Sequence, residues 1–254
     1  RWKRDWGKNY NDIVTGHLNL NPPIDLYVKN NTNYWVKKLN GKKLGNNSVR
    51  LFTPGLISDL EGYELGEWWI QDYSSQIPVS LLEIQNNDDV LDLCAAPGGK
   101  TAQLISLGAK VTSIDNNKKR LFRLEQNLKR LDYKAIVKNK DIRNFSTQKT
   151  WPKIILDAPC SSTGTLRKNP EIMHQKKESD IVSLSKLQSD LLDTAWDLLK
   201  EGGTLLYCTC SLEKEEGEHQ IENFIKRKKN SLLDKINNNE IDKKLNVSGQ
   251  NKWL

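Results

Sequence analysis

The chain has 254 residues, which is enough for one large α/β domain or for a medium-sized one with a small companion. Hydrophobic residues make up 37% of it and charged residues 28%, so it should fold around a core, and no apolar run is long enough to cross a bilayer. The net charge of +7 favours a polyanionic partner such as nucleic acid, although lysines scattered over the surface would give the same value.

Residues 1–66 predict a small domain of mixed composition. A polar, tryptophan-containing segment comes first, and the Pro22-Pro23 pair should interrupt any helix there. The residues IDLYV that follow are rich in strand formers and alternate as a strand does. Residues 31–66 are rich in Asn, Gly and Lys with short apolar islands, so we expect a small α+β unit here.

Residues 67–254 carry a longer and more regular pattern. The segment EWWIQDYSSQIPVSLLEI predicts an aromatic strand followed by an amphipathic helix. Short apolar runs then alternate with helical ones, which predicts a parallel sheet covered on both faces. The expected strands are residues 89–95, 109–115, 133–141, 153–159 and 202–211, and the expected helices are residues 100–107, 116–131, 179–200 and 213–229.

Polar residues gather where these strands end, and the carboxyl ends of parallel strands line the ligand crevice. The first strand runs into a loop with Gly98 and Gly99, and Asp115, Asp141 and Asp157 stand at later strand ends. The loop has neither the G-x-G-x-x-G pattern of a nicotinamide dinucleotide site nor the G-x-x-x-x-G-K-[ST] pattern of a phosphate loop. One carboxylate per strand end suits S-adenosylmethionine, which needs no phosphate cradle. Acids that only cap helices are the alternative.

The chain has four cysteines, and two of them stand at unusual places. Cys160, in DAPCSSTGTLRKNP, and Cys210, in YCTCS, lie where predicted strands open into loops, whereas Cys94 and Cys208 fit small buried strand residues. The charged, aromatic N-terminal segment is no signal peptide, so we expect reduced thiols in a cytoplasmic protein rather than disulfides. We expect no metal site, because only the C-x-C pair is close and no second pair accompanies it.

Three segments together resemble a known family: DLCAAPGGKT, DAPCSSTGTLRKNPEI and LLYCTCSLEKEEGEHQIENF. They are similar to the signature segments of the RsmB/Fmu (Sun) family of RNA cytosine-5 methyltransferases, and the likeness covers about residues 5–229. The resemblance implies a class I methyltransferase fold, with a Rossmann-like parallel sheet and a small N-terminal α+β domain of RNA-binding type. It also implies S-adenosylmethionine as cofactor, ribosomal RNA as substrate, and a monomeric enzyme with no membrane or metal partner.

The resemblance further implies the roles of individual residues. Cys210 would attack carbon 6 of the cytosine, Cys160 would help to release the product, and Asp157 would hydrogen-bond the base. The positive charge of Lys100 would favour the thiolate. The opposite assignment stays open, because DNA cytosine-5 methyltransferases place their nucleophile after a proline, as Cys160 stands here. The residues implied to bind the cofactor are Cys94, Ala95, Ala96, Pro97, Gly98, Gly99, Lys100, Asp115, Asp141 and Asp157.

Two departures from the family pattern bear on activity. We find no helical RNA-binding domain of the kind that often precedes the family's bacterial members, and no aromatic, glycine-bearing end segment after residue 229. We therefore expect a truncated C-terminal end, and an RNA-binding module with little or no catalytic activity is the alternative function. A nicotinamide oxidoreductase, the third hypothesis, would need a phosphate cradle. Arg167, Lys168 and the basic run 226–229 are candidate phosphate contacts, or solvated surface charges.

Overall fold

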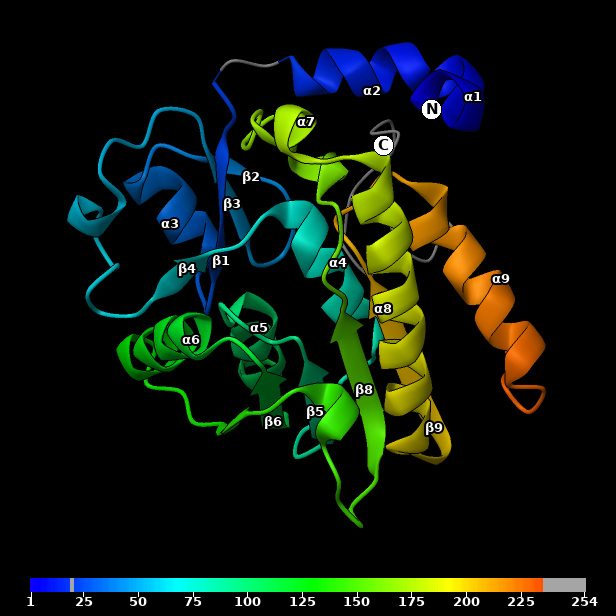
Figure 1. Ribbon diagram of the computed structural model, residues 1–254. Coiled ribbons are helices and arrows are strands. Elements are labelled where there is room, and N and C mark those ends of the chain that lie inside the picture. The colour runs from blue at the N-terminus through cyan, green and yellow to red at the C-terminus, as the bar shows by residue number, and fades with distance from the viewer. Residues whose placement is uncertain (19–20, 235–254) are drawn as a thin grey trace.

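Two sheets organise residues 1–18 and 21–234, the part of the chain that this computed structural model describes (Figure 1). The smaller sheet has the strand order β2-β3-β1-β4, and all neighbours are antiparallel. Trp35, from the helix α3 (Thr32–Lys38), packs with Leu26 and Trp68 in an apolar core of its own. The strands of this sheet are β1 (Ile24–Val28), β2 (Lys42–Lys43), β3 (Ser48–Leu51) and β4 (Trp68–Ile70).

The larger sheet has the order β7-β6-β5-β8-β9, and all neighbours are parallel. The prediction of a Rossmann-like parallel sheet is confirmed. The strand order changes direction at β5, and ligands bind beside such a switch point at the carboxyl ends of the strands. The strands are β5 (Asp89–Leu93), β6 (Lys110–Asp115), β7 (Ile136–Asn139), β8 (Trp151–Asp157) and β9 (Leu199–Cys208).

Helices cover both faces of the larger sheet, as Figure 1 shows. Successive residues of β5 point to opposite faces. Val90 lies in a buried cluster with residues of α4 and α5, whereas Leu91 and Leu93 lie in a cluster with residues of α8 and α9. The helices other than α3 are α1 (Trp2–Trp6), α2 (Tyr10–His17), α4 (Tyr73–Leu81), α5 (Gly99–Ser106), α6 (Lys118–Arg130), α7 (Ile172–Gln175), α8 (Glu178–Asp197) and α9 (Glu218–Arg227).

Several predicted boundaries differ from the observed ones, and three of the differences bear on the site. The sequence predicts a domain boundary at residue 66, but β4 pairs with β1, so the smaller sheet continues to Ile70. The last predicted strand ends earlier than expected, at Cys208, and leaves Cys210 in the following loop. The helix expected at residues 213–229 is divided at Gly217 into the 3-10 turn η5 (Lys214–Glu216) and α9. The expected truncation and the course of residues 235–254 lie outside the described residues.

Helix α6 connects the two sheets. The Nη1 of Arg130 donates to the carbonyl oxygens of Tyr63 at 2.6 Å and of Trp68 at 3.1 Å. Gly66 has a φ of +66° and lies so close to α6 that a Cβ there would stand 2.1 Å from the Arg130 carbonyl oxygen. The ring of Trp69 in β4 packs edge-on against that of Tyr133, which lies between α6 and β7, with ring centroids 6.2 Å apart. The smaller sheet is therefore held against the larger one by specific polar and aromatic contacts.

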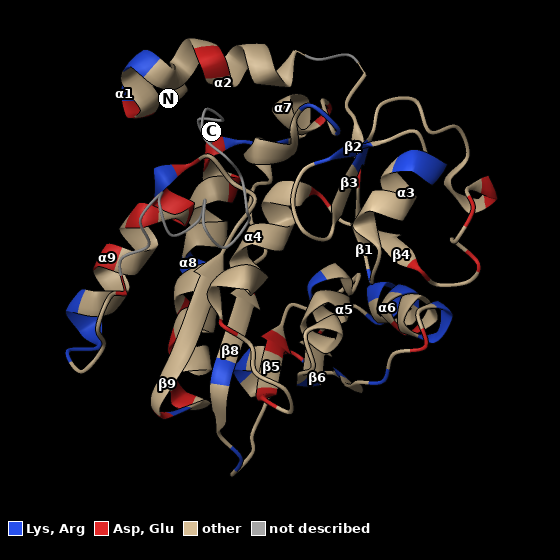
Figure 2. Cartoon of the chain, turned by 180° about the vertical axis from the view of Figure 1, so that it is seen from behind, with Lys and Arg blue, Asp and Glu red and all other residues tan. Residues whose placement is uncertain are grey.

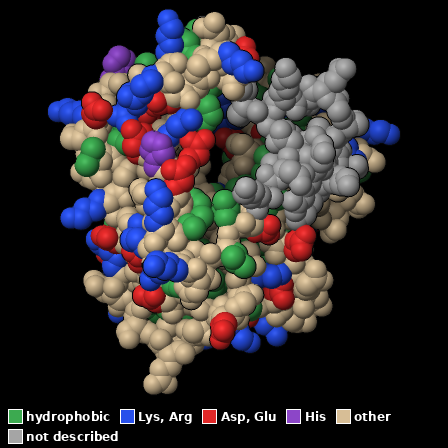
Figure 3. All heavy atoms as spheres, turned by 90° about the vertical axis from the view of Figure 1, so that its right-hand side faces the viewer, with side chains coloured by type: hydrophobic (Ala, Val, Ile, Leu, Met, Phe, Trp, Pro, Cys, Tyr) green, Lys and Arg blue, Asp and Glu red, His purple; other side chains and the backbone are tan. Residues whose placement is uncertain are grey.

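The surface carries mixed charge, with basic residues prominent on particular elements. Figure 2 shows Lys and Arg positions in blue along α6 and at the C-terminal end of α9. On the face seen in Figure 3, basic and acidic side chains are interspersed. Among the helices of the described residues, none combines the length and the apolar character needed to span a membrane.

Candidate active site

A cavity of about 380 Å³ opens at the carboxyl ends of the central strands. Asp115 accepts hydrogen bonds from the backbone N–H groups of Ala96 at 3.1 Å and Asn117 at 2.9 Å, so it also fixes the loop after β5. The guanidinium of Arg143 donates to Asp141 at 2.6 and 3.0 Å and lowers the pKa of that carboxyl. The lining of this smaller cavity includes Cys94, Asp115, Asp141, Asp157, Cys160 and Cys210.

A larger cavity of about 750 Å³ extends from the loop after β5 to residues of the smaller sheet. Asp157 and Cys210 line both cavities, so the two cavities meet at these side chains. The predicted cofactor residues are therefore divided: Cys94, Asp115 and Asp141 line the smaller cavity, and residues 95–100 line the larger one.

Asp157 and Lys100 form an ion pair where the cavities meet. The Nζ of Lys100 lies 2.7 Å from Oδ2 of Asp157 and 3.0 Å from Oγ of Ser75. Burial disfavours the charged form of Lys100, but the charge and hydrogen bond of Asp157, together with the charges of Cys208 and Asp92, outweigh this effect, and the pKa of Lys100 is raised. Lys100 is therefore a permanent positive charge that connects α4, α5 and the end of β8.

The two loops that carry the predicted catalytic cysteines lie side by side. Cys160 follows β8, Cys210 follows β9, and their Sγ atoms are 3.3 Å apart. The backbone N–H of Gly164 donates to the carbonyl oxygen of Cys210 at 2.9 Å, and a Cβ on Gly164 would lie 2.8 Å from that oxygen. Cys210 is exposed and Cys160 half-buried, so a ligand in the cavities can reach the Cys210 sulfur.

The surroundings of the two thiols make them unequal. The S–H of Cys160 donates to Cys210 and lowers the pKa of Cys210 to about 7, and the Ser162 hydroxyl, 3.4 Å away, acts in the same direction. The same hydrogen bond, together with burial, raises the pKa of Cys160. Burial also raises the pKa of Cys94 and of Cys208. Near neutral pH, Cys210 is the thiol that ionises, and the thiolate is the nucleophilic form.

The sequence profile described as "16S rRNA methyltransferase RsmB/F" matches residues 79–253. The chain belongs to the RsmB/F family. The Ribosomal RNA small subunit methyltransferase B of Cronobacter sakazakii is 40% identical over 249 residues, a match that covers 92% of this chain and 58% of the relative. The chain therefore spans a little over half the length of this curated relative, and the family resemblance found in the sequence is confirmed.

Solved structures share the fold. A methyltransferase homolog protein from Pyrococcus horikoshii superposes with a TM-score of 0.76 at 29% identity, over 89% of this chain and 76% of that one. The structure of NSun6 from Pyrococcus horikoshii with SFG superposes with a TM-score of 0.63 at 31% identity, over 72% of this chain and 49% of that one. These likenesses confirm the class I methyltransferase fold. Methyltransferases with this fold use S-adenosylmethionine as methyl donor.

The surroundings of Asp92, a residue that the sequence-based reasoning did not single out, show whether the site fits S-adenosylmethionine. It is fully buried in β5 and lines the larger cavity; its Oδ2 accepts a hydrogen bond from Oγ1 of Thr101 at 2.5 Å. Its Oδ1 has no hydrogen-bond partner among the described residues. Burial raises the pKa of Asp92 to about 7. An ammonium group would satisfy this oxygen, and S-adenosylmethionine carries one on its amino-acid part, so the residues present fit the cofactor.

The candidate phosphate contacts already have acidic partners. Lys168 pairs with Asp72, and Nη2 of Arg167 lies 3.8 Å from the same carboxylate. Both basic side chains line the larger cavity, so an RNA phosphate could replace Asp72 there. In the run 226–229, Arg227 pairs with Asp193 of α8 at 3.3 Å, and this run lines neither cavity.

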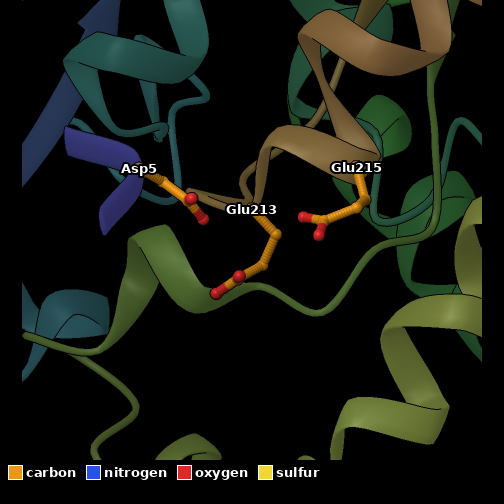
Figure 4. A group of neighbouring side chains, drawn as sticks. All are labelled: Asp5, Glu213 and Glu215. Carbon is orange, nitrogen blue, oxygen red and sulfur yellow. The ribbon is translucent and has the colours of Figure 1, made fainter. Parts of the chain in front are cut away.

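A cluster of three carboxylates lies beside the loop that follows Cys210. Asp5, Glu213 and Glu215 bring oxygens within 4.8 Å of one another, and in Figure 4 Asp5 and Glu215 approach Glu213 from opposite sides. Arg1 lies 3.1 Å from Glu213 and also pairs with Glu215, and Arg4 lies 2.6 Å from Asp5. These arginines supply the positive charge that the acids require, so the cluster gives no support to a metal site.

The same cluster belongs to a contact between α1 and the loop after Cys210. The indole Nε1 of Trp6 donates to the carbonyl oxygen of Leu212 at 3.0 Å, and that of Trp2 donates to Glu213 at 2.7 Å. Leu212 and Glu213 follow Cys210 by two and three positions in the chain. The N-terminal helix therefore supports the loop that carries the exposed thiol.

Proposed function

We propose that this chain transfers a methyl group from S-adenosylmethionine to carbon 5 of a cytosine in RNA, with small-subunit ribosomal RNA as substrate. One observation carries the proposal: two thiols of unequal pKa stand 3.3 Å apart beside Asp157, where the two cavities meet. Carbon 5 of cytosine is a poor nucleophile, and addition of a thiolate to carbon 6 makes it reactive. The cofactor, when bound, supplies an electrophilic methyl group.

Cys210 is the nucleophile in this scheme. Its thiolate forms a bond from Sγ to carbon 6 as the double bond between carbons 5 and 6 opens. The displaced electron density moves toward the ring nitrogen N3, which takes up a proton from solvent, and the N–H so formed donates to the Asp157 carboxylate. The charge of Asp157 raises the pKa of Cys210 and the charge of its partner Lys100 lowers it, so the low pKa of this thiol comes from its hydrogen bonds to Cys160 and Ser162. Asp92, Asp115 and Asp141 would hold the cofactor's amino group, ribose and adenine.

Cys160 assists the second stage. After methylation a base removes the proton from carbon 5, the bond between carbon 6 and Sγ breaks, and the aromatic ring and the Cys210 thiolate are restored. The pKa of Cys160 is raised first by its hydrogen bond to Cys210 and also by the charge of that sulfur. Once Cys210 is bonded to carbon, both effects are weakened, so Cys160 can lose its proton to solvent and then, as a thiolate, accept the proton from carbon 5.

Two variants test these roles. Cys210→Ala should abolish methyl transfer and covalent capture of RNA. In Cys160→Ala, the Cys210 thiolate should still add to carbon 6, and the covalent protein–RNA adduct should accumulate. Each protein is incubated with unmodified 16S rRNA transcript and S-adenosylmethionine, and the adduct appears as a slow band on a denaturing gel. The double variant controls for the origin of the band, which it should lack. If Cys160→Ala loses the attack while Cys210→Ala stays active, the roles are exchanged.

The choice of substrate rests on the likeness to the small-subunit methyltransferase of Cronobacter sakazakii. The target base must leave its stack, so a cytosine in a single-stranded or loop region is favoured. Bisulfite mapping of ribosomal RNA from cells with and without the gene should show one or more 5-methylcytosines that depend on it. Identical maps would contradict the choice of ribosomal RNA.

A non-catalytic RNA-binding module is not favoured, because the thiol pair, the Lys100–Asp157 ion pair and the unsatisfied Asp92 oxygen all lie at one site. A module that only binds RNA needs neither a reactive thiol pair nor a cofactor-binding carboxylate. We further propose that the protein acts as a monomer in the cytoplasm, where reducing conditions keep both thiols free. Light scattering after size exclusion tests the monomer.

A further inference from the structure

A single buried carboxylate connects the two cysteine loops. Glu216, the last residue of η5, is 0% exposed. Its Oε1 accepts the backbone N–H of Ser161 at 2.9 Å and the Nε2 of Gln188 at 2.9 Å. Its Oε2 accepts the hydroxyl of Ser211 at 2.5 Å and the hydroxyl of Ser161. Because Ser161 directly follows Cys160 and Ser211 directly follows Cys210, one side chain holds both loops.

The surroundings fix Glu216 itself. The hydroxyl of Tyr207 in β9 donates to its carbonyl oxygen at 2.7 Å. Gln188, also 0% exposed, donates not only to Glu216 but also to the carbonyl oxygen of Pro159 at 2.9 Å, which ties α8 to the residue before Cys160. Glu216 is thus anchored to the sheet through Tyr207 and to α8 through Gln188, in addition to the two cysteine loops that it binds.

We propose that Glu216 is a positioning residue that sets the separation of the Cys160 and Cys210 thiols, acting through Ser161 and Ser211. The inference rests on the proposed roles of the two cysteines. Without the carboxylate, four donor groups in the interior lose their acceptor, and rearrangement of the loops is the way to satisfy them. A displacement of about 1 Å is enough to cost roughly 100-fold in rate when two reacting groups must stay aligned.

Two substitutions of Glu216 distinguish a role in positioning the loops from a role of its negative charge. Glu216→Ala removes the acceptor. Glu216→Gln keeps the shape: its amide oxygen can accept from Ser161 and Gln188, and its amide N–H groups can donate to the two serine hydroxyls, which also accept. If Glu216 acts by positioning the loops, the Glu216→Gln variant should keep wild-type behaviour. If the negative charge is needed, this variant should lose it. Glu222→Ala, on the exposed side of α9, is the matched control.

The first measurement reports thiol separation without RNA or cofactor. Diamide oxidises two neighbouring thiols to a disulfide and takes up their two protons and two electrons. The Cys160–Cys210 disulfide, followed by mass spectrometry, should form in Glu216→Ala about tenfold more slowly than in the wild type, because the effective concentration of one thiol at the other falls. Glu216→Gln and Glu222→Ala should stay within about twofold of the wild-type rate.

The second measurement is methyl transfer to 16S rRNA. Glu216→Ala should lower kcat by about 100-fold and change KM for RNA less than about threefold, because Glu216 does not reach the cavities, and Glu216→Gln should restore kcat. Circular dichroism establishes that each variant is folded. Should Glu216→Ala fail to fold, Ser211→Ala, which removes one link and keeps the carboxylate, should slow the disulfide about threefold.

Either of two results overturns the inference: wild-type disulfide formation in the folded Glu216→Ala and Ser211→Ala variants, or a Glu216→Gln variant as slow as Glu216→Ala. The proposed function fails in a different way, through a wild-type protein that forms the disulfide rapidly but transfers no methyl group. The two failures are therefore distinguishable.

Discussion

At Cys210, two hydrogen bonds lower the pKa of one sulfur atom, from Cys160 and Ser162, while the charges of Asp157 and Lys100 act on it in opposite directions. The motif resemblance is sufficient to predict that Cys160 and Cys210 form the reacting pair. It is not sufficient to predict the 3.3 Å separation of their sulfurs, because that depends on how the fifty residues between them fold. The inequality of the two thiols is a property of the fold and not of the motifs.

The pH dependence of alkylation tests this inequality. Below its pKa, Cys210 is protonated and unreactive, so its alkylation by iodoacetamide should rise with pH and reach half its maximum near pH 7, the pKa that its surroundings produce. Cys160→Ala removes the main cause of the lowered pKa, and the midpoint should move up by about one pH unit toward the ordinary cysteine value. Peptide mass spectrometry gives the rates, and an unchanged midpoint would contradict the hydrogen bond.

Asp92 and Glu216 differ in how visible they are in the sequence. Asp92 interrupts the apolar run DVLDLCA, and a carboxylate inside a buried strand is a usable signal of function. Glu216 stands in KEEGE, where nothing distinguishes it from Glu215 or Glu218, and only the structure shows that it points inward. Burial of one member of an acidic run depends on tertiary packing, which local patterns do not encode.

Asp92→Asn should have opposite effects on binding and on stability. Loss of the charged acceptor should weaken S-adenosylmethionine binding about tenfold in isothermal titration. The carboxyl of Asp92 has a pKa raised to about 7, so the folded state holds a proton that the unfolded state releases above about pH 4. Wild-type stability therefore falls between about pH 4 and pH 7, and in thermal melts at pH 8 the unliganded variant should be the more stable protein. Unchanged titration curves would exclude Asp92 from the cofactor site.

At the scale of elements, apolar periodicity predicts the strands and their order well but misplaces their ends. The strand expected to reach residue 211 stops at Cys208, because it pairs with β8 and β8 ends at Asp157 opposite it. The sequence YCTCS has no breaking residue at that point. Strand ends are set by the partner strand, which lies about fifty residues away in the chain.

The contact between the loops after β8 and β9 can be tested at Gly164. Gly164→Ala places a methyl group against the carbonyl oxygen of Cys210 and forces the two loops apart. Methyl transfer should fall about 10- to 100-fold. Gly16→Ala in α2, where a Cβ meets nothing within 4 Å, is the matched control and should keep wild-type activity. Equal turnover in both variants, measured with tritiated cofactor, would show that the approach of the loops is unimportant.

At the scale of the whole molecule, composition predicts two units but not the way they join. The sequence boundary at residue 66 falls within the segment that joins them, since β4 belongs to the smaller sheet and Gly66 packs on α6. The larger cavity takes its lining from both units, including Gln71 after β4 and Arg130 of α6. The relative placement of the two sheets is therefore part of the site, and no local pattern specifies it.

Arg130→Ala tests the junction. It removes two hydrogen bonds from a charged donor to backbone carbonyls, so the free energy of unfolding should fall by about 2 kcal/mol, or about 4–8 °C in Tm for a chain of this size. Arg123→Ala, exposed on the same helix, is the control and should change stability by less than about 0.5 kcal/mol. Denaturant titration measures both. A loss no larger than that of the control would show that α6 does not hold the smaller sheet.

The indole groups of Trp2 and Trp6 donate hydrogen bonds to Glu213 and Leu212, immediately beyond the proposed nucleophile Cys210. The residues most remote from Cys210 along the polypeptide are therefore among its nearest supports in space. A shortened protein that begins after α1 would lose the hydrogen bond to the Leu212 carbonyl. We expect any loss of activity in that protein to come from displacement of the Cys210 loop and not from loss of an RNA-binding surface. We therefore expect tags and deletions at α1 to change the position of the loop that carries Cys210.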